Sequence, residues 1–458
     1  MITRSLSKYL AELSPYTELR VQENKSLNMT FLNGDMVDNS KTTRNGVSAR
    51  VYKGGSWGFA SSSELDEKYI REVLRDAEQN ASFLNSRSSV NKPNFPKTIG
   101  YMEKDLRTIK TKLTAAQLKE YVSELDRYIG EKYPHLAQRI VVSRSLSMEK
   151  TLVTSDGSTF YSFVPFSIIY VILSIVKDGE PTEILEVLGG KGEFEDNFNN
   201  PSEQYAKIDQ LYELLIQKSE GVHANVGLQD VILDSSVGGI LAHEAIGHTT
   251  EADLVLGGSI AGDYLNKQVA SPLVNLVDFA HTYQGNFCPI PIFMDDEGVV
   301  CEDVTIIENG ILKNFMHNKE SAELFNTIPR GNARAYGFDD EPLIRMRNTA
   351  ILPGNSKLEE MIASIENGYY FTKTGNGQAD TTSEFTFSIN MGYEIKNGKL
   401  GRAIKDTTIS GIAFDVLKTV SMVSDDMTWD IGMCGKKQSI PVGMGGPAIK
   451  CKVNVGGK

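Results

Sequence analysis

The chain is poor in the residues that cross-link secreted proteins or anchor proteins in membranes. It has four cysteines in 458 residues, too few for a disulfide scaffold, so we expect a reducing compartment. Its most apolar run, residues 163–176, is shorter than the roughly 20 residues that span a bilayer. The first residues, MITRSLSKYLAELSPY, lack the apolar core and small-residue cleavage site of a signal peptide. We therefore expect a cytoplasmic protein without a membrane segment.

Positive charge is also scarce. Lys and Arg number 47 against 59 Asp and Glu, which gives a net charge of −12. Proteins that bind nucleic acid non-specifically need a basic surface, so no direct nucleic-acid binding is expected. Hydrophobic residues make up 40% and charged residues 23% of the chain, which is typical of a globular protein and excludes wholesale disorder.

The order of predicted elements indicates two domains and an α+β fold. Residues 1–221 combine short strands, separated by Asn-Gly and Gly-Gly turns, with helices of amphipathic spacing. We expect this part to be an α/β domain, with a polar linker near residue 222. The predicted elements are strands at 27–31, 46–52 and 56–60, helices at 65–81, 114–129 and 202–219, and several antiparallel strands within 138–190.

Residues 222–458 are expected to form a mostly β domain that carries the helix described next. Strands flank Asn309-Gly310 and Asn397-Gly398, dipeptides that favour β-hairpin turns. A short helix is predicted to begin at Ser356, because Glu359 stands three residues later, as in a capping box. Another is predicted at 412–420.

Histidine is rare, with six in the chain, yet two flank a glutamate in LAHEAIGHTTEAD (241–253). Zinc proteases carry H-E-x-x-H on one helix, with histidines four residues apart. Here His243 and His248 are five apart. On a regular α-helix that step leaves two side chains about 140° apart, too far to bind one ion.

A single π-bulge would restore the site. An i→i+5 hydrogen bond inserts one residue and brings position i+5 back over position i. Gly247 stands just before His248 and has poor helix propensity, which fits a distorted helix. The spacing therefore predicts a locally widened helix; the alternative is that the two histidines and Glu244 occur together by chance.

A catalytic zinc site takes three protein ligands and leaves one position for water. Glu244 follows the first histidine and is placed to act as general base on a metal-activated water. Two residues are candidates beyond the histidines. Glu251 could bind the metal or orient a histidine, and Cys434 has Lys436 and Lys437 beside it, which favour a thiolate. The other cysteines are expected in the core: Cys288, Cys301 and Cys451.

Four stretches, in order and spread over nearly the whole chain, resemble the TldD/PmbA family. They are NGVSARVYKGGSWGFAS (45–61), HEAIGHTTEAD (243–253), GNARAYG with PLIRMRNTAILPG (331–354) and CGKKQSIPVGMGGP (434–447). The resemblance implies a cytoplasmic zinc metallopeptidase for small or unfolded peptides. PmbA-like subunits lack the histidine motif, so the chain resembles a TldD-like subunit. A homodimer, or a heterodimer with a PmbA-like partner, is implied.

Carried over by position, the resemblance implies that His243, His248 and Cys434 bind zinc and that Glu244 is the base. Glu251 is left to orient a histidine. The segment Asp295-Asp296-Glu297-Gly298 replaces the family's D-D-G-T stretch, and Lys437-Gln438 replaces its G-Q, which bears on substrate and partner choice.

Three polar residues also match the family pattern: Arg334, Arg345 and Asn348. Arginine captures carboxylates with two hydrogen bonds, so they are candidates to hold a peptide terminus, with structural salt bridges as the alternative. Two other functions remain open: a non-enzymatic regulator that binds DNA gyrase or another protein, and a different zinc hydrolase such as an amidase.

Overall fold

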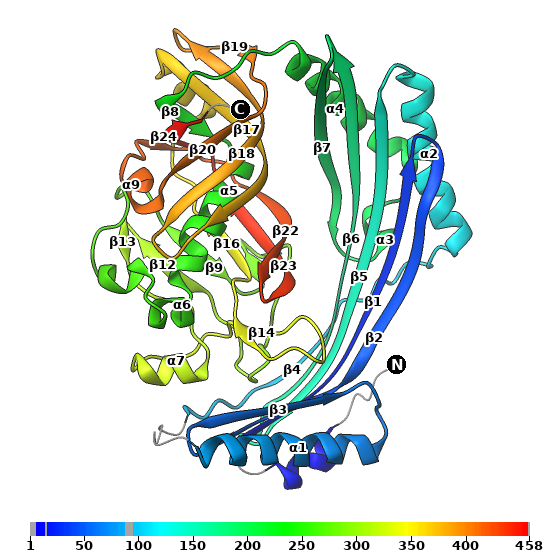
Figure 1. Ribbon diagram of the computed structural model, residues 1–458, viewed down its shortest axis with the longest axis vertical. Coiled ribbons are helices and arrows are strands. Elements are labelled where there is room, and N and C mark those ends of the chain that lie inside the picture. Colours follow the sequence, from blue (N-terminus) through cyan, green and yellow to red (C-terminus); the bar gives the residue numbers. More distant parts are fainter. Residues whose placement is uncertain (1–5, 14–15, 88–94, 457–458) are drawn as a thin grey trace.

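A computed structural model describes residues 6–13, 16–87 and 95–456. A long curved sheet with helices at both ends lies beside a thicker body of shorter strands (Figure 1). The first is built from residues before 220, and the second from residues after it. The α+β prediction, an α/β region followed by a mostly β region with the histidine helix, is confirmed.

The N-terminal sheet contains four strands of 17 to 19 residues: β1 (Tyr16–Leu32), β2 (Asp35–Lys53), β5 (Gln138–Thr154) and β6 (Thr159–Lys177). Shorter strands complete it: β3 (Ser56–Ser62), β4 (Tyr101–Asp105) and β7 (Glu180–Lys191). The order is β3-β2-β1-β5-β6-β4, and β7 also pairs with β6. The strands predicted at 27–31 and 46–52 are only pieces of β1 and β2. Their polar remainder hides the pattern, because residues 35–44 of β2 are almost all exposed.

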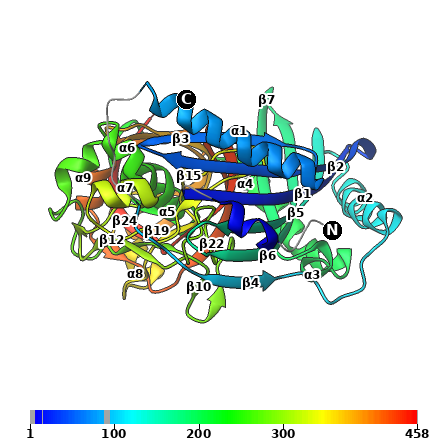
Figure 2. The same cartoon turned by 90° about the horizontal axis from the view of Figure 1, so that it is seen from below.

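Helices cover the two ends of this sheet, as Figures 1 and 2 show. α1 (Glu67–Asn85) packs near β3, and α2 (Ala115–Lys132) and α4 (Tyr205–Ser219) pack at the other end; α3 (Phe194–Asn197) and 3₁₀ turns at Ser7–Glu12 and Pro201–Gln204 are short. α2 begins with a reciprocal capping box. The Thr114 Oγ1 accepts the Gln117 N–H at 3.3 Å, and the Gln117 Oε1 accepts the Thr114 N–H at 2.9 Å. All three predicted helices are confirmed, with shifted ends.

The C-terminal body contains two larger sheets. The first has the order β17-β8-β24-β20-β18-β19, with β21 on β24; its strands are β8 (Gly227–Leu233), β17 (Asn367–Ala379), β18 (Glu384–Lys396), β19 (Lys399–Ala403), β20 (Thr407–Ile412), β21 (Met422–Val423) and β24 (Ile449–Val455). The second has the order β13-β12-β9-β16-β23-β22; its strands are β9 (Leu276–Phe279), β12 (Val304–Glu308), β13 (Ile311–Leu312), β16 (Asn348–Ile351), β22 (Thr428–Lys436) and β23 (Gln438–Gly446).

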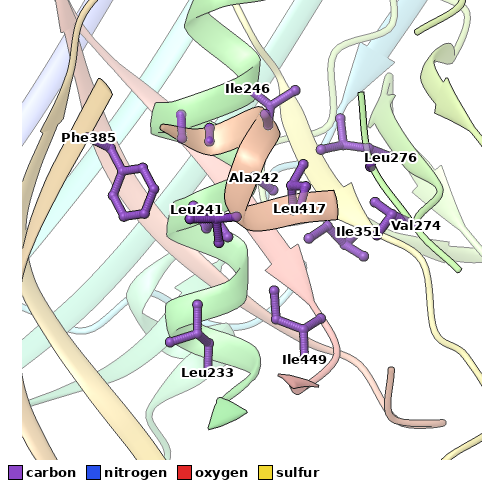
Figure 3. Packing of buried hydrophobic residues seen from close by; sticks show 14 of the residues in the cluster. Leu233, Leu241, Ala242, Ile246, Val274, Leu276, Ile351, Phe385, Leu417 and Ile449 are labelled. Carbon is purple, nitrogen blue, oxygen red and sulfur yellow. The ribbon is translucent and has the colours of Figure 1, made fainter. Parts of the chain in front are cut away.

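The histidine helix lies between these sheets, at the largest hydrophobic cluster. α5 (Ser235–Ile240) leads into it at Leu241. Figure 3 shows Leu241 and Ala242 among Phe385 of β18, Ile351 of β16 and Leu417. The helix is thus held from both sides by apolar contacts. Smaller elements complete the body: β10 (Thr282–Tyr283), β11 (Asn286–Phe287), β14 (Ala333–Arg334), β15 (Leu343–Ile344), α6 (Ala252–Leu256), α7 (Lys319–Leu324), α8 (Leu358–Ala363), α9 (Ala413–Lys418) and 3₁₀ turns at His248–Thr250 and Ile260–Tyr264.

Two predicted hairpins are confirmed, and one helix start is corrected. Asn309-Gly310 joins β12 to β13, and Asn397-Gly398 joins β18 to β19. α8 starts at Leu358, two residues later than predicted, with Lys357 as N-cap. Ser356 lies outside the helix, where its backbone N–H donates to Val423 and its carbonyl accepts from Asp425.

Buried charges join the two regions. Asp296 of the body is bound by Arg20 of β1 at 3.3 Å and by Lys150 of β5 at 2.6 Å. Glu297 accepts from Arg50 of β2. The segment that departs from the family's D-D-G-T stretch is therefore an anchor between the regions.

The predicted boundary at residue 222 falls between α4 and β8. No strand pairing among the described residues links the N-terminal sheet to the sheets of the body. We keep the division into 1–221 and 222–458 as a proposal. Within the described parts of the chain, no helix is long and apolar enough to cross a membrane.

Candidate metal centre

The helix through the histidines is widened as its spacing predicts. Residues Leu241–Gly247 form a π-helix, and the His248 N–H donates to the carbonyl of His243, five residues earlier. The two imidazole rings therefore lie side by side in an edge-to-face arrangement, with centroids 5.2 Å apart and planes at 75°. The predicted π-bulge is confirmed.

Gly247 is needed for a different reason from the predicted one. Its φ of −56° and ψ of −54° are ordinary helical values, so its conformational freedom is not used. A Cβ at this position would lie 1.9 Å from the Met346 Sδ. Gly239 is similar, because a Cβ there would lie 3.1 Å from the backbone nitrogen of Gly445 in β23. These glycines let the helix lie directly against its neighbours.

Three donor side chains converge at the end of the π-helix. Ligand atoms of His243, His248 and Cys434 all lie within 4.8 Å of one another. The Cys434 Sγ lies 3.2 Å from the His248 Nε2. Of the two candidates for the third ligand, Cys434 is the one that completes a three-donor group.

Glu251 lies behind His248 instead. Its Oε2 is 3.1 Å from the His248 Nδ1, on the ring edge opposite Cys434. Carboxylates that hydrogen bond to a histidine in this way fix the ring orientation and its tautomer. The Lys436 Nζ reaches the same carboxylate at 3.0 Å and also contacts Asp253. The sequence pointed to Lys436 only as a neighbour of Cys434, and its contact with Glu251 depends on the fold.

His243 shows that the group fits a metal ion. The side chain is 1% exposed, and neither ring nitrogen has a hydrogen-bond partner among the described residues. Burial, with the charges of His248 and two arginines, lowers the pKa of His243 well below its usual value, so the ring is neutral. A buried polar group without a partner is costly, and a cation would satisfy it. Two imidazoles and a thiolate are common zinc donors.

The surroundings of His248 favour positive charge. Burial alone would lower the pKa of His248, but hydrogen bonds with Cys434 and Glu251 outweigh it and raise the pKa to about 10. The same two groups, Cys434 and Glu251, would stabilise a cation bound at this place.

Glu244 lies at the accessible edge of the group. Its side chain is 24% exposed, and its Oε2 lies 3.7 Å from the His248 Nε2. Burial, and then the charge of Glu251, raise the pKa of Glu244 above its usual value, against the opposing effect of His248. A carboxylate with a raised pKa is a better proton acceptor near neutral pH.

The three residues proposed to hold a peptide terminus are buried and bound to backbone carbonyls. Arg345 donates to the carbonyl of Cys434 at 2.6 Å and to that of Gln438 at 2.9 Å. Arg334 donates to Pro441 and Met346, and Asn348 to Ile290. This favours the structural alternative, although carbonyl hydrogen bonds take the place of the expected salt bridges. Arg345 holds the β22–β23 hairpin that carries Cys434.

The remaining cysteines lie in the core, as predicted. Cys288, Cys301 and Cys451 are buried and free. Burial raises the pKa of each thiol to about 12, so they stay protonated.

A cleft of about 450 Å³ runs between the two regions, and its lining includes residues of α5 and β22 but none of the three donors. On one side it is lined by Tyr170 and Leu185 of the N-terminal sheet, and on the other by Ile240 and Trp429. An adjoining space of about 300 Å³ reaches Met433, the neighbour of Cys434. The cleft therefore follows the strand that carries the third donor.

Comparison with known proteins identifies the family. Residues 227–457 match the family domain described as "PmbA/TldA metallopeptidase C-terminal domain". Residues 17–81 match the one described as "PmbA/TldA metallopeptidase domain 1". A metalloprotease of Methanocaldococcus jannaschii is 32% identical, over 96% of this chain and 97% of its own. The chain belongs to the TldD/PmbA metallopeptidase family. The resemblance in the sequence motifs is thereby confirmed, and this TldD/PmbA chain is an enzyme of the metallopeptidase class.

One further relative of this TldD/PmbA chain supports the assignment, and one solved structure shares its fold. A Saccharolobus solfataricus protein named a zinc metalloprotease TldD homolog is 30% identical over 90% of each chain. A Thermotoga maritima structure, described as that of a proposed modulator of a DNA gyrase, has a TM-score of 0.78 at 20% identity and covers 96% of each chain. At that identity the likeness shows a shared fold alone.

Proposed function

We propose that this chain is a TldD-like, zinc-dependent metallopeptidase that hydrolyses small or unfolded peptides in the cytoplasm. The observation that carries the proposal is the convergence of His243, whose ring nitrogens are buried and unpartnered within the described structure, with His248 and Cys434. The name of the Saccharolobus solfataricus relative supports zinc as the metal.

Each residue of the group has a distinct role in this proposal. His243, His248 and Cys434 would hold zinc, which supplies a Lewis acid that polarises a carbonyl and lowers the pKa of water. Glu244 accepts the proton of the attacking water and passes it to the leaving amine. Glu251 fixes the ring of His248, and Lys436 balances the charge of Glu251.

The cleft supports an extended substrate. Its volume of about 450 Å³ is that of a site for a small ligand. A short or unfolded peptide could lie in it, whereas a folded domain could not. The resemblance to TldD-like subunits further suggests a homodimer or a heterodimer with a PmbA-like subunit around this site.

The proposal is tested with the purified chain and two variants. Metal content is measured by mass spectrometry, and cleavage of an unstructured peptide is followed by chromatography, with and without a PmbA-like partner. We expect Glu244→Gln to keep zinc and to cleave about 10²–10⁴-fold more slowly, because a general base contributes that much. Cys434→Ala should bind zinc more weakly.

Two results would contradict the proposal. If the wild type and Glu244→Gln carry zinc and neither cleaves any peptide, even with the partner present, a binding regulator becomes the better hypothesis. If Cys434→Ala binds zinc as tightly as the wild type, Cys434 is not a ligand.

A further inference from the structure

Three buried hydroxyl groups surround the end of the π-helix. The Thr249 Oγ1 lies 2.9 Å from the carbonyl oxygen of Ile246. The Thr250 Oγ1 lies 2.9 Å from the same oxygen and 3.0 Å from that of Gly247. The Ser383 Oγ lies 3.3 Å from the carbonyl of Ala245. We call Thr249, Thr250 and Ser383 the hydroxyl cluster; each is at most 1% exposed.

The carbonyls of Ala245, Ile246 and Gly247 need hydrogen-bond donors because the helix ends just after them. Glu251 is extended, with φ −72° and ψ 123°, so this helix stops there and α6 begins separately at Ala252. The last carbonyls of a helix have no intrahelical N–H to accept. They are also buried from water, where an unmet carbonyl is costly. The hydroxyl cluster supplies the donors.

We propose that Thr249, Thr250 and Ser383 are positioning residues that hold the helix in its π register, and so hold His243 and His248 together. The inference rests on the proposed zinc site. π-Turns are rare, which shows that the backbone alone does not favour them. In a regular α-helix the two histidines would point about 140° apart. The hydroxyl groups that donate to the carbonyls of this turn favour the helical register that brings His243 and His248 together.

Two further contacts fix the hydroxyl cluster from outside the helix. Ser383 has a φ of +69°, a conformation uncommon outside glycine, and it lies in the turn between β17 and β18. Its carbonyl accepts the Ala413 N–H at 2.8 Å. The carbonyl of Thr249 in turn accepts from the Ser259 hydroxyl at 2.7 Å. The end of the π-helix is thus tied to two distant segments.

A threonine that bonds to a carbonyl three or four residues earlier is common in helices, so the test needs a matched control. Thr419 provides one at the end of α9. Its hydroxyl contacts the carbonyl of Val416 at 2.6 Å and the N–H of Lys452 at 2.9 Å, but none of the three metal donors. Thr419→Val removes the same kind of hydrogen bond elsewhere in the same body.

The experiment compares zinc affinity and site geometry in hydroxyl variants. Thr249→Val combined with Thr250→Val keeps side-chain shape and removes both donors; Thr249→Ser with Thr250→Ser restores them. Zinc affinity is measured by competition with a chromophoric chelator, and geometry by the absorption spectrum of the cobalt(II) form. We expect the valine pair to lose about 10–100-fold in zinc affinity, as outer-shell changes do, and to alter the cobalt spectrum. The serine pair and Thr419→Val should match the wild type.

The possible failures are distinguishable. If the valine pair binds zinc and cobalt as the wild type does, the positioning role is wrong and the zinc site stands. If the wild type binds neither metal, the proposed function is wrong, and the positioning role with it. Should the valine pair fail to fold, as judged by circular dichroism, Ser383→Ala removes a single donor from outside the helix. It should weaken zinc binding less strongly, and unchanged binding would count against the inference.

Discussion

The N-terminal sheet and the C-terminal body differ in the partners of their backbone N–H and C=O groups. β1 pairs with β2, and β5 with β6, along nearly their whole lengths. Charged pairs between this sheet and α1 are exposed, as between Lys53 and Glu78 with side chains 42% and 45% exposed. In the body, charged side chains such as Asp278 and Arg347 are fully buried and bound to the backbone.

In the sheet the partners of backbone groups are other backbone groups, whereas in the body side chains supply part of them. A long antiparallel ladder pairs its own N–H and C=O groups, so few of these groups need a side-chain partner. In the short strands and loops of the body, side chains donate to several of the backbone carbonyls. Arg347, for example, donates to the carbonyls of Arg330 and Glu302 while it pairs with Asp278. The metal donors are assembled in this second kind of framework, where Cys434 joins His248 from 186 residues away in the sequence.

The largest expected effect on stability comes from Arg347→Met. Asp278 would keep its buried charge and lose the Arg347 Nε, 2.8 Å away, and the carbonyls of Arg330 and Glu302 would lose donors. Breaking a buried pair by removing one partner costs about 3–5 kcal/mol. Urea unfolding of the purified variant measures the loss.

The matched change in the other region is Lys53→Met. Lys53 and Glu78 are both more than 40% exposed, so the loss should be less than about 1 kcal/mol. Equal losses for Arg347→Met and Lys53→Met would break the distinction between the two regions.

Gly247→Ala tests the close packing beside the metal donors. The new Cβ would lie 1.9 Å from the Met346 Sδ, so the helix or Met346 must move. Overpacking of this kind costs about 1–3 kcal/mol, and displacement of the turn should also weaken zinc binding. Thermal unfolding and chelator competition measure the two effects.

A double-variant cycle separates the close contact from helix propensity. Met346→Ala removes the side chain that the new methyl group meets, so Gly247→Ala should cost less in that background than alone. If the cost is the same in both backgrounds, the contact with Met346 does not explain the glycine.

Features set by local sequence spacing were predictable, whereas contacts between distant segments were not. Apolar spacing places α1, α2 and α4, because their burial repeats with the helical period. The five-residue spacing of His243 and His248 predicts the π-helix if both bind one ion, since a regular α-helix would hold the two side chains too far apart. The roles of Arg345 and Asn348 were not predictable, because their carbonyl partners, Cys434 and Ile290, lie 89 and 58 residues away in the sequence.

A smaller effect than that of Gly247→Ala is expected for Thr114→Ala, in the N-terminal region. Thr114 is the N-cap of α2 and exchanges two hydrogen bonds with Gln117. Loss of such a cap costs about 1 kcal/mol, because one helical N–H loses its acceptor. The group at His243 lies in the other region, so zinc affinity should not change. Urea unfolding and chelator competition on the same sample decide the matter. A change in zinc affinity without a change in stability would mean that the two regions are coupled more tightly than their separate sheets indicate.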